Sequence, residues 1–95
     1  MKNLIEALEA GKRRGYDEVR IIDSIKYLFQ YAIKMDKGVY LTYFLKINEA
    51  KFDEFEDFAE EEIMKFTEFQ NVLQYFNKHG ADVQRMGAIK RTLPF

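Results

Sequence analysis

Eight carboxylates crowd into the segment from Glu49 to Glu62, where they are interleaved with three phenylalanines. Such a block can hold a hard cation, because carboxylate oxygens are its preferred ligands, or it can imitate the charged backbone of a nucleic acid. A calcium loop needs a glycine at its bend, and this segment has none. Proteins that mimic nucleic acids are strongly acidic overall, whereas this chain has a net charge of −1. We therefore expect neither a metal nor a cofactor here.

The spacing of the block predicts an amphipathic helix over residues 49–65. Its apolar residues share one face of a helical wheel and are expected to pack on the core: Phe52, Phe55, Phe58, Ala59, Ile63 and Phe66. Its acidic residues share the opposite face, where like-charged pairs four positions apart repel each other by about 0.2–0.5 kcal/mol. A helix face that repels itself indicates a basic partner. We expect the contact residues to be Asp53, Glu54, Glu56, Asp57, Glu60 and Glu61.

Two tyrosines add a second candidate contact. Tyr27 and Tyr31 stand four positions apart, on the polar side of a helix predicted over residues 18–36. Tyrosine is favoured in recognition surfaces because it supplies a large contact area with little rotamer entropy. We expect the pair to anchor a partner, unless another element of the chain covers them.

Catalytic chemistry has little support in the sequence. The single histidine, His79, stands at the end of a predicted helix, where a cation suits the helix dipole. The single serine, Ser24, has Asp23 beside it but no base at a recognisable spacing. Paired carboxylates act as acid and base only in a cleft that gives them different environments. We expect a protein that is not an enzyme.

Basic residues support an alternative function, the binding of nucleic acid. They gather in two places, Lys12-Arg13-Arg14 and the tail residues Arg85, Lys90 and Arg91. Residues 48–62 carry a net charge of −7, while the segments before and after them each carry +3. A pI near 5.8 and the lack of a glycine-rich phosphate loop argue against a dedicated nucleic-acid binder.

The segment 18–36 fits two patterns. Apolar residues at odd positions from Val19 to Ile33 fit a strand. A helical wheel gathers a larger apolar set into one arc: Ile21, Ile22, Ile25, Leu28, Phe29, Ala32, Ile33 and Met35. We therefore predict a helix there, with Asp17 as its N-cap and Gly38 in a left-handed conformation after its end.

The other elements follow from hydrophobic periodicity. Helices are predicted over about residues 3–14 and 68–79. The run at 39–47, rich in β-branched and aromatic residues, predicts a strand. Its partner within the chain is expected to be the tail at 86–95; otherwise the strand pairs with another copy of the protein or is a further helix.

Together these elements predict a single α+β domain over residues 1–95 that is mainly helical, with about four helices around a small two-stranded sheet. The alternative is an all-α bundle. The predicted function is a non-catalytic protein–protein interaction module of the inhibitor, immunity or adaptor type. Its expected partner is a larger protein with a basic surface, for example a nucleic-acid-processing enzyme, and a homodimer is also compatible. The chain has no cysteine and no apolar run of about 20 residues, so we expect a cytoplasmic protein without a membrane partner.

Overall fold

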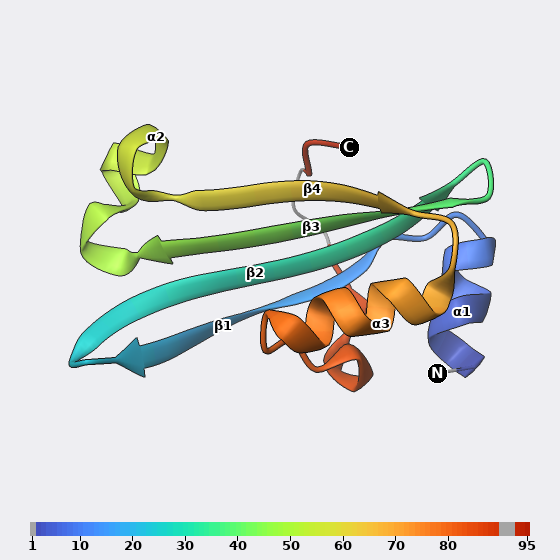
Figure 1. The fold of residues 1–95 in the computed structure, drawn as a ribbon, viewed down its shortest axis with the longest axis horizontal. Helices are drawn as coiled ribbons and strands as arrows, with labels where there is room; N and C mark the ends of the chain where they lie inside the picture. The colour runs from blue at the N-terminus through green and yellow to red at the C-terminus, as the bar shows by residue number, and fades with distance from the viewer. Residues whose placement is uncertain (1, 90–92) are drawn as a thin grey trace.

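The computed structural model describes residues 2–89 and 93–95, and its centre is an antiparallel β-sheet (Figure 1). The strands lie in the order β4-β3-β2-β1-β5. Their bounds are Arg14–Ile22 (β1), Ile25–Asp36 (β2), Val39–Asn48 (β3), Glu60–Phe66 (β4) and Gly87–Ala88 (β5). The described helices are Lys2–Glu9 (α1), Phe55–Phe58 (α2) and Phe69–Lys78 (α3), with 3-10 helices at Glu49–Glu54 (η1) and Val83–Arg85 (η2). The prediction of a mainly helical fold around a two-stranded sheet is wrong, and so is the all-α alternative.

The helix predicted over residues 18–36 is wrong because this segment forms the hairpin of β1 and β2. Asp23 and Ser24 have φ angles of 51° and 67°, so they form a two-residue turn of the kind that joins antiparallel strands. Ile22 and Ile25 are paired across this turn. The side chains that face the helices therefore stand at even positions in β1 and at odd positions in β2. Because the buried positions change from even to odd at the turn, no single alternation of apolar and polar residues runs through the whole segment. The two strands are therefore hard to recognise from the sequence.

The strand predicted over residues 39–47 is confirmed as β3, but its partners are β2 and β4 rather than the tail. Lys37 and Gly38, with φ angles of 52° and 80°, form a second two-residue turn between β2 and β3. Gly38 thus has the predicted left-handed conformation, at the end of a strand rather than a helix. In the tail, β5 pairs with Arg14 and Gly15 of β1.

The helix predicted over residues 49–65 is also wrong. The segment consists of η1, α2 and β4, with a break at Ala59. Phe52 and Phe58 are 54% and 48% exposed, so they are not the buried face of a helix. Phe55 lies in α2, and its side chain is outside the described part of the structure. Short helical turns and an edge strand leave most side chains in water, which is compatible with the many carboxylates of this segment.

Two predicted helices are confirmed. The helix predicted over residues 68–79 is α3, which buries Val72 and Phe76. The helix predicted over residues 3–14 is α1, which ends earlier, at Glu9, and has Leu8 fully buried. None of the described helices combines the length and the apolar character that crossing a bilayer requires.

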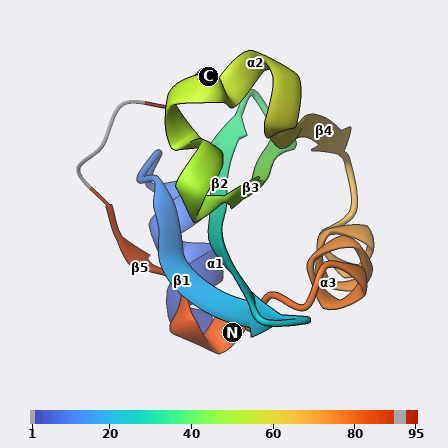
Figure 2. The same cartoon turned by 90° about the vertical axis from the view of Figure 1, so that its left-hand side faces the viewer.

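The sheet has two faces of different character. Helices α1 and α3 pack on one face, here called the helix face, around a cluster that includes Phe29, Tyr31, Ile33 and Phe44. The opposite face, here called the tail face, carries a smaller cluster in which Leu93 packs against Ala32, Tyr43 and Leu45. The main core thus lies between the sheet and the helices α1 and α3. Figure 2 shows the sheet and the helices end-on.

Candidate interaction surface

The acidic residues predicted to bind a partner lie at one end of the sheet. Asp53 and Glu54 belong to η1, and Asp57 belongs to α2. All three side chains are exposed. Glu56 is also in α2, and its side chain is outside the described part of the structure. Residues 49–58, here called the acidic lobe, follow β3 and form the upper left end of the molecule in Figure 1.

The other two predicted acids, Glu60 and Glu61, belong to β4 rather than to the acidic lobe. Both are exposed, and their side chains point to opposite faces of the sheet because strand residues alternate. Glu61 accepts a hydrogen bond of 2.7 Å from the hydroxyl of Tyr43 on the tail face. The structure therefore divides the predicted acidic face into a lobe and a strand.

Most of the lobe's negative charge is not neutralised within the described part of the chain. Lys51 lies 3.5 Å from Glu54, and its ammonium group also lies over the ring of Phe58 at 5.1 Å. Among the described side chains, no ion pair involves Asp53 or Asp57. Within the described side chains, Asp53 and Asp57 of the lobe thus form no ion pair, and they lie on short helical turns rather than on the predicted long helix.

Exposed apolar side chains gather at the same end of the molecule. Six of the eight large apolar side chains that are exposed in the described part lie there: Val19, Ile21, Ile22, Ile25, Phe52 and Phe58. The first four lie in residues 19–25, here called the hairpin tip, where β1 and β2 extend at the lower left of Figure 1. Ile21 is the most exposed, at 68%. A concentration of exposed apolar area of this kind marks an interaction site more often than a scatter of single residues does.

A hollow of about 450 Å³ joins the hairpin tip to the acidic lobe. It is lined by Ser24, Ile25, Lys26, Asn48, Glu49 and Ala50. The side-chain oxygen of Asn48 accepts a 2.9 Å hydrogen bond from the backbone N–H of Ala50, which fixes the start of the lobe beside the hollow. Residues of the tip and of the lobe therefore line one hollow. Figure 2 shows this end of the molecule facing the viewer.

The two predicted tyrosine anchors have different positions. Tyr31 is completely buried on the helix face, where its hydroxyl donates a 2.9 Å hydrogen bond to Glu18. It therefore cannot contact a partner of the folded protein. Tyr27 is half-buried, and the ammonium group of Lys46 lies 4.8 Å from its ring centre. Another element of the chain therefore covers Tyr31, which is the alternative that the sequence analysis left open for this pair.

Glu18 is the centre of a polar cluster on the β1 side of the sheet. It accepts hydrogen bonds from Tyr31 and from Arg20, the latter at 2.8 Å, and Arg85 lies 3.3 Å from its other oxygen. Burial alone would raise the pKa of Glu18, but the hydrogen bonds and the two guanidinium charges outweigh it and lower the pKa below its ordinary value. Burial and the hydrogen bond to Glu18 raise the pKa of Tyr31. This cluster ties β1 to β2 and to the segment that follows α3.

The basic residues of the alternative function are dispersed. Arg85 is engaged by Glu18 and lies 4.3 Å from the ring of Tyr16. The guanidinium of Arg14 donates to the backbone oxygen of Arg13. Lys90 and Arg91 are outside the described residues. The structure thus brings no phosphate-binding cluster together from the residues it describes.

The two residues considered for catalysis, His79 and Ser24, occupy structural positions. His79 packs against the ring of Phe44 at 4.2 Å and lies 3.8 Å from Glu62. Ser24 lies in the hairpin turn at the tip. Within the described part of the chain, no three histidine or acidic side chains are placed to share a metal ion.

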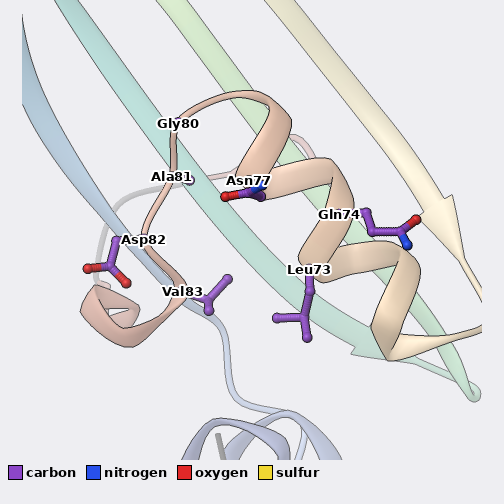
Figure 3. Close-up of a pocket in the computed structure, with 7 residues that line it drawn as sticks. All are labelled: Leu73, Gln74, Asn77, Gly80, Ala81, Asp82 and Val83. Carbon is purple, nitrogen blue, oxygen red and sulfur yellow. The ribbon is translucent and has the colours of Figure 1, made fainter.

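A second hollow, of about 530 Å³, lies beside the C-terminal half of α3 (Figure 3). Its walls are Leu73, Gln74, Asn77, Gly80, Ala81, Asp82 and Val83. Asp82 is the only ionisable group among them, and it accepts a 3.0 Å hydrogen bond from the backbone N–H of Gln84. This hollow therefore offers amide and apolar walls with one carboxylate, which caps the 3-10 helix η2.

Sequence reasoning missed the hairpin tip. The signal was present as Ile21-Ile22-Asp23-Ser24-Ile25, in which apolar residues flank two residues suited to a turn. The helical interpretation placed these isoleucines in the core. No family model, no curated protein and no solved structure matches this chain.

Proposed function

We propose that this protein is a non-catalytic protein–protein interaction module of the inhibitor, immunity or adaptor type. Its binding surface consists of the hairpin tip, the acidic lobe and the hollow between them. The partner is a larger protein with an apolar patch bordered by lysines and arginines. One observation carries the proposal: exposed apolar side chains and carboxylates that form no ion pair with another described side chain, Asp53 and Asp57, occupy the same end of the molecule.

The two halves of the surface have separate roles in binding. Burying Ile21 and Phe52 against apolar groups of a partner supplies the favourable free energy, because both side chains are more than half exposed. Asp53 and Asp57 supply electrostatic attraction, which speeds association with a basic surface and weakens as salt is added. A surface with both components favours a protein partner over nucleic acid, whose phosphates the carboxylates repel.

The shape of the surface supports the same partner. The hairpin tip and the lobe both reach the same end of the molecule (Figure 1), and the hollow lined by residues of both can receive a side chain of the partner. The hairpin turn and the Asn48 hydrogen bond hold the two walls in place before binding. Such preorganisation lowers the entropic cost of association.

The test compares capture of proteins from a lysate of the cells that make this protein, using immobilised wild type and two disrupted variants. The apolar variant carries Ile21→Ser and Phe52→Ser, and the charge variant carries Asp53→Lys and Asp57→Lys. The matched control carries Glu6→Lys and Glu9→Lys, the same change of charge on exposed positions of α1 at the opposite end of the sheet (Figure 1).

We expect wild type and control to capture the same basic protein, and both disrupted variants to lose it while their circular dichroism spectra stay unchanged. Equal capture by all four proteins contradicts the proposal. Loss of capture in the α1 control alone places the binding surface elsewhere and also contradicts it.

A further inference from the structure

Strand β4 is an open edge of the sheet. It pairs with β3 on one side, and in the described part of the structure no strand pairs with its other side. Its first six residues, Glu60 to Lys65, are all exposed, on both faces of the sheet. An edge of this kind presents backbone N–H and C=O groups that can pair with another strand. Figure 2 shows β4 at the rim of the sheet, away from β1.

The charge pattern of β4 is complementary to itself. The strand has seven residues, and Ile63 is the middle one. When two copies run antiparallel with Ile63 opposite Ile63, Glu61 of each copy stands directly opposite Lys65 of the other. Glu60 stands opposite Phe66, and Glu62 stands opposite Met64. This register pairs the whole strand and places no carboxylate opposite another.

Other two-fold registers are less favourable. Centring the pair on Glu62 places Glu62 of one copy directly opposite Glu62 of the other. Centring it on Met64 pairs only residues 62–66 of the strand. Charge and strand length together therefore favour the register centred on Ile63.

The faces of the sheet agree with this register. Glu61, Ile63 and Lys65 pair with Leu45, Tyr43 and Leu41 of β3, so all three side chains lie on the tail face. The opposite charges of two copies therefore meet on the same side of the joined sheet. Ile63 and Met64, which are 44% and 37% exposed, lose part of their contact with water when the strands pair.

We propose that two copies of this protein join along β4 in antiparallel register about Ile63, which extends the sheet continuously from one copy into the other. The occupant of the β4 edge is a second copy, and the contact is independent of the hairpin tip and the acidic lobe. Both copies keep those surfaces free, so the dimer presents two binding ends to partners.

The test is sedimentation velocity over a wide range of protein concentration. We expect a concentration-dependent dimer of the wild type. Glu61→Lys alone and Lys65→Glu alone each place like charges opposite one another twice per dimer, and each is expected to weaken dimerisation by about tenfold or more.

Mixing the two single variants provides the sharpest outcome. The Glu61→Lys variant has lysine at positions 61 and 65, and the Lys65→Glu variant has glutamate at both. In the mixed pair every one of these lysines faces a glutamate, so a heterodimer is expected to form where neither variant dimerises alone. The double variant Glu61→Lys, Lys65→Glu restores opposite charges and is expected to dimerise like the wild type. It also lacks the hydrogen bond from Tyr43 to Glu61, so its recovery separates interface charge from local structure.

The control is Glu9→Lys on α1, which changes the net charge as Glu61→Lys does and is expected to leave dimerisation unchanged. A wild type that remains monomeric over the whole range overturns the proposal. So does a dimer whose stability is the same in all of these variants and in the mixture.

Discussion

The two edges of the sheet differ in how they end. Beyond the short pairing of β1 with β5, helix-face side chains of β1 contact the segment that follows α3. There the backbone N–H of Asp82 donates to the hydroxyl of Tyr16 at 2.7 Å, Arg85 reaches Glu18, and Arg20 donates to the backbone oxygen of Gly80. At the other edge, β4 has six exposed residues in succession, and no strand of the described part pairs with its outer side.

The difference indicates a division of roles between stability and association. Side chains on the β1 side satisfy one another within the chain, so replacing them should change the free energy of unfolding. On β4, Glu62 accepts a hydrogen bond from Tyr75 and Phe66 packs on the core. Glu61, Ile63 and Lys65 are exposed, however, so replacing these three should change association and leave folding nearly unaffected. Each prediction below tests one side of this comparison against the other.

The largest effect on folding is expected from Gly15→Ala in β1. A methyl group at Gly15 overlaps the backbone oxygen of Tyr31 in β2, and the two strands must move apart to accept it. We expect a loss of about 3 kcal/mol in the free energy of unfolding, measured by urea denaturation. The matched control is Gly87→Ala in β5, where the nearest atom is 4.0 Å away, and a change within about 0.5 kcal/mol is expected. Equal effects at the two glycines contradict the packing described for β1.

A smaller effect is expected from Glu18→Gln. Glu18 is 14% exposed and accepts hydrogen bonds from Tyr31 and Arg20, so its replacement removes the charge that both depend on. We expect a loss of about 2 kcal/mol in the free energy of unfolding. Glu61→Gln is the counterpart on β4, since Glu61 also accepts a tyrosine hydroxyl but is exposed, and it should cost less than about 0.5 kcal/mol. If the two variants lose the same stability, the edges do not differ in the way described.

The pH dependence of stability should identify the same group. Because the folded state lowers the pKa of Glu18, its contribution is present above the ordinary value of 4.5 and is lost as the pH falls through the folded value. The wild type should therefore lose stability on acidification more steeply than Glu18→Gln, and the two should converge at low pH. Urea midpoints measured from neutral pH to below 4.5 check this expectation. Parallel curves would assign the acid sensitivity to other carboxylates.

The smallest effect concerns salt. The Glu61–Lys65 contacts between two copies are exposed, and about 1 M salt shortens the screening length to about 3 Å. We expect dimerisation to weaken by a few fold as salt rises, while the urea midpoint of the monomeric Glu61→Lys variant changes little. A dimer that strengthens with salt would indicate an apolar contact in place of the charge pairs.

The sequence predicted the elements whose periodicity is unbroken. Helix α3 has its apolar residues at helical spacing, with Val72 and Phe76 buried, and β3 is a continuous β-branched and aromatic run. The hairpin of β1 and β2 escaped because the turn at Asp23 and Ser24 shifts the alternation by one position. The pattern on either side of it then accidentally resembles a helix.

The acidic segment escaped for a different reason. Its break at Ala59 separates short helical turns from an edge strand, and neither half buries a complete face. Periodicity reports which side of an element is buried, so it carries no information where both sides are wet. The exposure of Asp53 and Asp57 was predictable from their charge alone, whereas the burial of Tyr31 depends on long-range pairing with β1 and β3.

Amide hydrogen exchange, measured by NMR at low and at high protein concentration, tests the contrast between the two edges most directly. Alternate residues of an edge strand direct their N–H groups outward, so these amides exchange quickly in a monomer and slowly once another strand pairs with them. We predict that raising the concentration slows exchange at alternate residues of Glu60–Phe66, symmetrically about Ile63, and leaves Arg14–Ile22 unchanged. Exchange in β4 that does not depend on concentration, or new protection that appears first in β1, would contradict the account.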